Sequence, residues 1–303
     1  MFGPNNPHGR GDGLIMVEVH RIAAFTTDPA GGNPAGVVVT DHHLEPARMQ
    51  QMAADVGFSE TAFLVPAARD GTSPAEAVGG GMWQVRYFAP ESEVPFCGHA
   101  TIAAGVVLGR QRGSGRATFD TAAGRVHVDI DTGGTHPTAT LTSVVPRVEQ
   151  PEGALVDAAL ATMGWRRDVL DPALEPALAD AGARHLVLPV RTRDLLADLS
   201  YDYEALRAIC ASADLITVAV LWRETAHRLH ARNPFPIGGV VEDPATGAAA
   251  AAVGAWLRAR GAVEPPATVE ILQGHDMGRP SHLTVDIPEG TGGIAVTGTA
   301  VDL

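Results

Sequence analysis

Glu60 is the carboxylate whose surroundings in the sequence best suit acid–base chemistry. It follows Phe58 and Ser59 and precedes an apolar run that includes Phe63. An apolar setting removes water from a carboxylate, raises its pKa and lets it exchange protons near neutral pH. We therefore predict that Glu60 is a general base. A carboxylate at the rim of a site, or a charge at a helix end, gives the same pattern, so these alternatives stay open.

Two glycine-containing segments open predicted helices and are candidate anion sites. One is Cys97-Gly98-His99, and the other runs from Asp243 to Gly247. The first amides of a helix lack internal acceptors and lie at the positive end of the helix dipole, so each start can hold a carboxylate. The same dipole disfavours the imidazolium form of His99 and leaves a neutral group that can polarise a substrate. The alternatives are an ordinary N-cap at Asp243 and a packed structural histidine at position 99.

An internal repeat links these two helix starts. Residues 86–108 and 232–260 each contain a strand arginine, a proline-containing loop, an Ala-Thr pair at a helix start and an apolar helix with an internal glycine. Such a duplication favours two similar halves related by a pseudo-two-fold axis. We expect the two copies to face each other across a cleft.

The chain alternates short strand patterns with helical ones. Strands are predicted at 17–22, 36–39, 61–65, 83–88, 117–121, 125–131, 138–144, 185–190, 216–221 and 225–231. Helices are predicted at 45–56, from within 95–101 to 108, and at 155–163, 203–211 and 244–260. Leu195 is placed in a connecting turn and 71–81 in a glycine-rich hairpin loop. We predict a flexible leader at 1–15 and domains at 16–135 and 136–303, and we leave open that the terminal strands cross over.

Composition and charge argue against several classes of function. The net charge is −13 with only 22 Lys and Arg residues, so nucleic-acid partners are not expected. No stretch is long and apolar enough to span a membrane. The histidines show no metal-ligand spacing and the glycine pairs form no phosphate loop, so we expect no metal and no cofactor. Cys97 and Cys210 lie far apart, which argues against a disulfide framework and predicts a reducing, cytoplasmic location. Cys97 has no matching second thiol for a proton shuttle, so we expect it to be a small packing residue.

Five motifs resemble the PhzF-like phenazine-biosynthesis family, within the diaminopimelate epimerase superfamily. They are Asn33-Pro34-Ala35-Gly36-Val37, Ser59-Glu60-Thr61-Ala62-Phe63, Phe96-Cys97-Gly98-His99-Ala100-Thr101, Glu242-Asp243-Pro244-Ala245-Thr246-Gly247, and Gln273-Gly274 with Gly278-Arg279-Pro280-Ser281. The resemblance spans residues 16–303. It implies an α+β, diaminopimelate-epimerase-like fold, with two pseudo-symmetric halves that each wrap a curved, mostly antiparallel sheet around a central helix. It also implies an active site between the halves and a homodimer.

The resemblance further implies roles for individual residues. Glu60 corresponds to the family's acid/base glutamate, which shifts a proton on a cyclohexadiene amino acid. Asp243, Gly98 and His99 correspond to groups that hold the substrate and relay protons. The predicted substrate-binding residues are Ser59, Gly98, Ala100, Thr246 and Gly247. The superfamily's pair of racemising cysteines is not intact, which argues against diaminopimelate epimerase activity.

Ala248 is a departure from the PhzF-type motif, which commonly continues with serine at this point. The missing hydroxyl weakens the expectation for the phenazine precursor itself but leaves the proton-transfer groups in place. We therefore predict a cofactor-independent isomerase or epimerase that acts on a small carboxylate-bearing, amino-acid-like substrate. Two alternatives stay open: a non-catalytic protein that binds a small molecule or another protein in the cleft, and a lyase that uses the same base.

Overall fold

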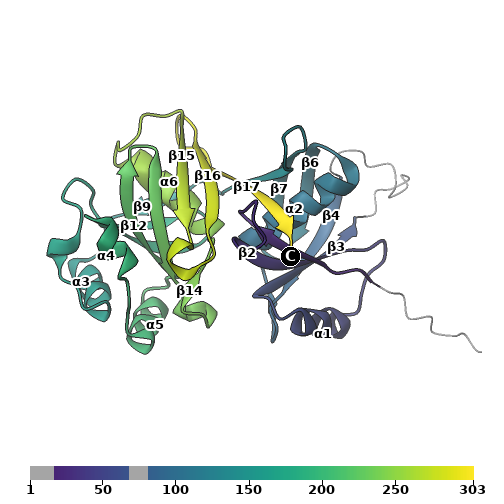
Figure 1. The fold of residues 1–303 in the computed structure, drawn as a ribbon, viewed down its shortest axis with the longest axis horizontal. Coiled ribbons are helices and arrows are strands. Elements are labelled where there is room, and N and C mark those ends of the chain that lie inside the picture. Colours follow the sequence, from purple (N-terminus) through teal and green to yellow (C-terminus); the bar gives the residue numbers. More distant parts are fainter. Residues whose placement is uncertain (1–16, 68–80) are drawn as a thin grey trace, which may run out of the picture.

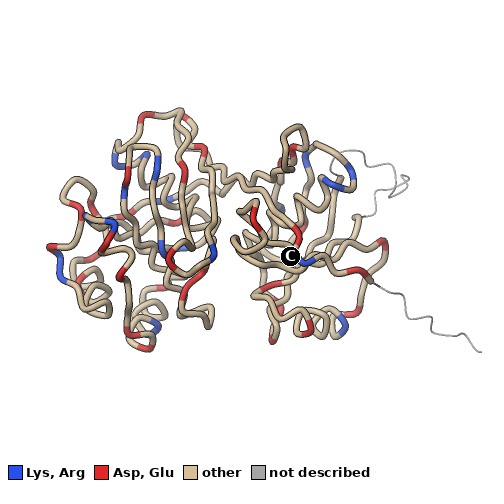
Figure 2. The backbone as a smooth tube through the Cα atoms, in the orientation of Figure 1, with Lys and Arg blue, Asp and Glu red and all other residues tan. Residues whose placement is uncertain are grey.

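The protein consists of two lobes that lie side by side. The structure, a computed structural model, describes residues 17–67 and 81–303. The predicted leader and residues 71–80 of the predicted hairpin loop lie outside the described residues. Strand β17 (Ala295–Asp302) crosses from the second lobe to the first (Figure 1). Acidic and basic residues are interspersed over both lobes (Figure 2).

The elements of each lobe follow one another along the chain. The first lobe contains β1 (His20–Ala24), β2 (Asn33–Val39), α1 (Pro46–Val56), β3 (Glu60–Pro66), β4 (Met82–Phe88), β5 (Glu93–Val94), α2 (Gly98–Arg112), β6 (Gly115–Thr121), β7 (Gly124–Asp131) and β8 (Thr138–Thr142). The second contains β9 (Arg147–Glu149), α3 (Gly153–Thr162), η2 (Arg167–Val169), β10 (Ala177–Asp180), β11 (Arg184–Val190), α4 (Arg193–Ala197), α5 (Tyr203–Ser212), β12 (Thr217–Thr225), β13 (Arg228–Pro234), η3 (Pro236–Gly238), β14 (Glu242–Asp243), α6 (Gly247–Ala259), β15 (Ala267–Gln273), η4 (His275–Met277) and β16 (Ser281–Ile287).

The strands of the first lobe form a closed ring. β1, β2, β3, β4, β6, β7 and β8 pair in that order, and only the β2–β3 and β4–β6 pairs among them are parallel. β17 pairs with both β8 and β1. The last strand of the chain therefore closes the ring of the first lobe. This is the crossover of a terminal strand that the sequence analysis left open. The predicted division at residue 135 falls in the turn between β7 and β8.

The second lobe repeats this arrangement. β10, β11, β12, β13, β15, β16 and β17 pair in order, and the β11–β12 and β13–β15 pairs are parallel. The two-residue strand β14 pairs with β13 as β5 pairs with β4. The same succession of parallel and antiparallel pairs occurs in both lobes, so the structure confirms the predicted α+β fold of two similar halves.

Each lobe contains one helix that is apolar on every side. All residues from 99 to 109 of α2 are buried, as are nearly all residues of α6. Gly105 and Gly254, at equivalent places in the repeat, let these helices approach their sheets closely. A methyl group at Gly105 would lie 2.7 Å from Cβ of Ala139, and one at Gly254 would lie 2.8 Å from Cγ1 of Val285. The internal glycines thus serve packing.

Some local predictions differ from the structure. Leu195 lies in the short helix α4 and not in a turn, because the Thr192 side chain caps the helix by accepting a hydrogen bond from the Leu195 amide. Residues 222–225 continue β12, so the next strand begins at Arg228 and not at 225. Among the described residues, no helix combines the length and the apolar character needed to cross a membrane.

Candidate active site

Glu60 lies at the interface of the lobes as the first residue of β3, paired with Ala35 of β2. Its side chain is 19% exposed. Its Oε2 atom is buried and makes no hydrogen bond, although Nε2 of His99 lies 3.4 Å away. Among the described residues, His99 is the only ion-pair partner of this carboxylate. A desolvated carboxylate with one free oxygen is able to accept a proton from a substrate.

His99 is the second residue of α2 and is 7% exposed. Its Nε2 atom lies 3.3 Å from Oγ of Ser59, and its Nδ1 atom lies 3.4 Å from Sγ of Cys97. Burial raises the pKa of the Cys97 thiol well above its ordinary value, and negative charge on Glu60 adds to the rise. Cys97 is therefore a neutral thiol against the imidazole. Cys97 belongs to the hydrophobic core, which agrees with its expected packing role, and it also contacts His99.

Asp243, at the end of β14, is held by groups from both lobes. Nδ2 of Asn33 donates to Oδ1 at 2.7 Å, and it also donates to the Ala245 carbonyl at 3.0 Å. The Thr246 hydroxyl donates to Oδ2 at 2.5 Å, and Nε2 of Gln273 donates to the Asp243 carbonyl at 2.7 Å. Both carboxylate oxygens are thus oriented by donors, and one of these donors comes from 210 positions earlier in the chain.

Electrostatics link Asp243 to the groups on the other lobe. Burial raises the pKa of the Asp243 carboxyl above its ordinary value, and negative charge on Glu60 adds to this effect. Positive charge on His99 acts in the opposite direction. The Asp243 carboxyl therefore lies close enough to Glu60 and His99 for their charges to change its protonation.

The two helix starts face each other. A methyl group at Gly98 would come within 4.0 Å of the Ala248 amide nitrogen, and one at Gly247 within 3.6 Å of Cζ of Phe25. The first amides of α2 and α6 lack acceptors within their helices, and two dipoles point their positive ends at the same space. A substrate carboxylate between the helices would meet N–H donors from both lobes.

The remaining predicted substrate-binding residues differ in what they offer. The hydroxyls of Ser59 and Thr246 are directed at His99 and Asp243. The side chain of Ala100 is fully buried in the core, so only its backbone amide lies at the helix start. Asn33 and Gln273 belong to the motifs that resemble the family, but the sequence predicts no role for them. Nothing local in the sequence shows that they reach Asp243.

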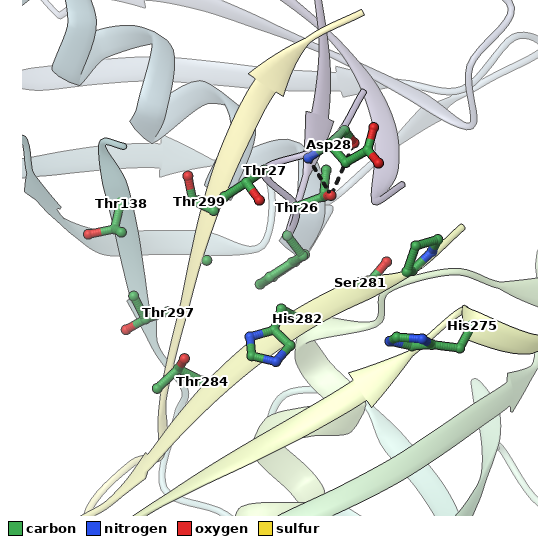
Figure 3. A pocket seen from close by; sticks show the side chains of 13 residues that line it. Thr26, Thr27, Asp28, Thr138, His275, Ser281, His282, Thr284, Thr297 and Thr299 are labelled. Carbon is green, nitrogen blue, oxygen red and sulfur yellow. Dashed lines mark hydrogen bonds between the residues drawn. The ribbon is translucent and has the colours of Figure 1, made fainter. Parts of the chain in front are cut away.

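A separate hollow of about 380 Å³ lies at the junction of the lobes (Figure 3). Its lining includes His275, His282 and several threonines of β16 and β17, but none of Glu60, His99 and Asp243. The predicted acid–base groups therefore belong to a different part of the lobe interface.

Comparison with known proteins identifies the family. Residues 22–303 match the family model described as phenazine biosynthesis-like protein. The chain belongs to this family. It is 33% identical over 286 residues to an uncharacterized isomerase of Deinococcus radiodurans, across 90% of this chain and 87% of that protein. It is 29% identical over 274 residues to the trans-2,3-dihydro-3-hydroxyanthranilate isomerase of Pseudomonas fluorescens, across 86% of each chain.

A solved structure agrees with this assignment. The phenazine biosynthesis protein of the PhzF family from Bacillus anthracis matches with a TM-score of 0.80 and 24% identity, over 94% of this chain and 96% of that one. The fold is therefore that of the phenazine biosynthesis-like family, and the chain is an isomerase of that family.

Proposed function

We propose that this family member moves a proton on a small carboxylate-bearing, amino-acid-like substrate, without a cofactor, and that Glu60 is the acid/base group. The observation that supports the proposal most directly is the buried Oε2 of Glu60, which makes no hydrogen bond and lies 3.4 Å from Nε2 of His99 at a helix start.

The arrangement suggests a sequence of proton transfers. The substrate carboxylate binds the helix-start amides, which fixes the substrate and stabilises negative charge as it develops. Glu60 then takes a proton from a C–H bond, and the electron pair of that bond delocalises into the substrate. Return of a proton to a different carbon gives isomerisation, and return to the opposite face of the same carbon gives epimerisation. We infer that His99 and Asp243 relay that proton.

The named relative guides the choice of substrate. The Pseudomonas fluorescens protein is named for trans-2,3-dihydro-3-hydroxyanthranilate, a small amino carboxylate. Ala248 replaces the serine expected at the start of α6, so this chain has no hydroxyl at that point. We propose that the substrate is of the same chemical class and makes fewer hydrogen bonds at this end of the site.

Deuterium uptake measured by proton NMR tests the proposal. The chain is incubated in deuterated buffer with a panel of small amino and hydroxy acids that includes trans-2,3-dihydro-3-hydroxyanthranilate. Glu60→Gln keeps the size of the side chain and removes the base, so uptake should fall by at least about a hundredfold. Glu91→Gln, an exposed glutamate in the same lobe, is the matched control and should leave uptake unchanged.

The outcomes separate the competing functions. Uptake by Glu60→Gln equal to that of the unaltered chain refutes the role of Glu60. Binding of a panel member, seen as thermal stabilisation without exchange or product, indicates a non-catalytic binding protein. A product that lacks the β-hydroxyl of the substrate indicates a lyase.

A further inference from the structure

Glu60, Cys97 and His99 bring three different ligand atoms to one place. Sγ of Cys97, a ring nitrogen of His99 and a carboxylate oxygen of Glu60 all lie within 4.8 Å of one another. Nε2 of His99 is 3.4 Å from Oε2 of Glu60 and 3.9 Å from Sγ of Cys97. The sequence spacing does not show this cluster, because Glu60 lies on β3 whereas Cys97 and His99 lie at the start of α2.

These separations suit a tetrahedral cation. Zinc bond lengths of about 2.0–2.3 Å at tetrahedral angles put neighbouring ligand atoms about 3.3–3.6 Å apart. The N–O separation already lies in this range. The N–S separation of 3.9 Å is longer, and the S–O separation is at most 4.8 Å, so ligation requires side-chain rotations that draw the sulfur toward the other two atoms. Cys97 and His99 are each 7% exposed, so a cation bound to them would be largely shielded from solvent. Three protein ligands leave a fourth coordination position for water or another small ligand.

The donor set selects the class of cation. A thiolate, an imidazole and a carboxylate suit zinc and similar borderline-soft ions, whereas magnesium and calcium prefer oxygen ligands throughout. Thiolate and carboxylate together carry two negative charges, which a divalent cation neutralises. Asp243 adds a further negative charge nearby. Without a cation Cys97 is a neutral thiol. The positive charge of the bound cation would therefore have to stabilise the thiolate that ligates it.

We propose that Cys97, His99 and Glu60 form a binding site for a zinc-class divalent cation, and that the bound cation inhibits the isomerase. Binding breaks the S–H bond of Cys97, forms a metal–sulfur bond and releases the proton to solvent, with no change of oxidation state. The cation takes the lone pairs of Glu60 and His99, so neither group can move a substrate proton. The inhibition rests on the proposed function, whereas the binding does not.

Cobalt(II) is the probe for binding to the full-length chain, because thiolate ligation gives a charge-transfer absorption in the near ultraviolet. We expect this band to saturate with one equivalent of Co²⁺ and to disappear when Zn²⁺ displaces it. Cys97→Ala and Cys97→Ser should both lose the band. Cys210→Ala is the matched control, because Cys210 is buried in the core of the second lobe, away from the site, and it should keep the band.

A second variant, at Glu60, keeps the test of the site decisive if the Cys97 variants do not fold. Glu60→Gln keeps the thiol and removes one charged ligand, so it should keep the band but weaken Co²⁺ affinity by at least about tenfold. The absence of a thiolate band in the unaltered chain overturns the proposed site. Unchanged Zn²⁺ affinity in the Cys97 and Glu60 variants does so as well, because the cation would then be bound elsewhere.

Inhibition is measured separately, as deuterium uptake with and without Zn²⁺. We expect Zn²⁺ to abolish uptake and a chelator to restore it. Saturated binding with undiminished uptake overturns the inhibitory role. If no substrate in the panel exchanges a proton in the unaltered chain, the proposed function fails while the cobalt titration still decides whether the site exists.

Discussion

The internal repeat supplies a matched pair of ion pairs that differ in burial. Arg232 of β13 pairs with Glu242 of β14, and Arg86 of β4 pairs with Glu93 of β5. The side chains of the first pair are 13% and 6% exposed, and those of the second are 39% and 37% exposed. Both pairs place two guanidinium nitrogens on one carboxylate. The two pairs differ in their access to water, and Arg232 also hydrogen-bonds to backbone carbonyls, whereas Arg86 lies over the ring of Phe88.

Arg232→Met should cost far more stability than Arg86→Met. Removing the Arg232 guanidinium leaves the Glu242 carboxylate buried without its partner, which costs about 3–5 kcal/mol. It also removes hydrogen bonds from Nη1 to the carbonyls of Ala197 and Leu199, both 3.0 Å long. The exposed pair gains little from its Coulomb attraction, so Arg86→Met should cost about 0–1 kcal/mol.

Urea unfolding followed by circular dichroism measures both changes. The double variant Arg232→Met with Glu242→Met removes the uncompensated charge and should recover most of the loss. Equal losses from Arg232→Met and Arg86→Met would refute the argument from burial. A double variant no more stable than Arg232→Met alone would show that the stranded carboxylate is not the cause. Because Glu242 precedes Asp243 in β14, Arg232→Met should also reduce deuterium uptake.

Three further predictions concern buried polar side chains. Burial raises the pKa of the Asp243 carboxyl above the ordinary 3.8, so the folded chain should lose stability as pH rises through this window, and urea titrations of Asp243→Asn over a series of pH values should lack this slope. Burial lowers the pKa of His185 from 6.5 to about 4, so stability should fall by about 3 kcal/mol as pH drops through that window, and a titration series of His185→Gln should lack this slope. Asn33→Ala removes two donors and should cost about 2–4 kcal/mol and at least about tenfold in deuterium uptake. Gln50→Ala, which removes two amide–carbonyl bonds within the first lobe, should lower stability without changing uptake.

Features with a local signature were predictable from the sequence. The starts of α2 and α6 follow from glycine after a loop and before an apolar run, and the repeat follows from strand arginines at equivalent places. Glu60 was identified from its apolar neighbours, and the structure places it at the start of β3. Its role in catalysis stays a prediction.

Features that depend on distant pairing were not predictable. The Asn33–Asp243 hydrogen bond joins residues 210 positions apart, and no periodicity encodes such a contact. β5 and β14 have two residues each, too few to show an alternating pattern. Cys97 packs in the hydrophobic core as expected, whereas the sequence does not show that the His99 ring turns toward its sulfur.

The position of β17 in the chain has a consequence for synthesis. All other strands of the first lobe are complete by residue 142, yet the ring stays open between β1 and β8 until residues 295–302 are available. During translation the edges of β1 and β8 in the first lobe should therefore stay unpaired while the whole second lobe is synthesised. β1 and β8 are the edges that a chaperone would have to shield during this interval, and the two lobes should acquire protease resistance together when β17 leaves the ribosome.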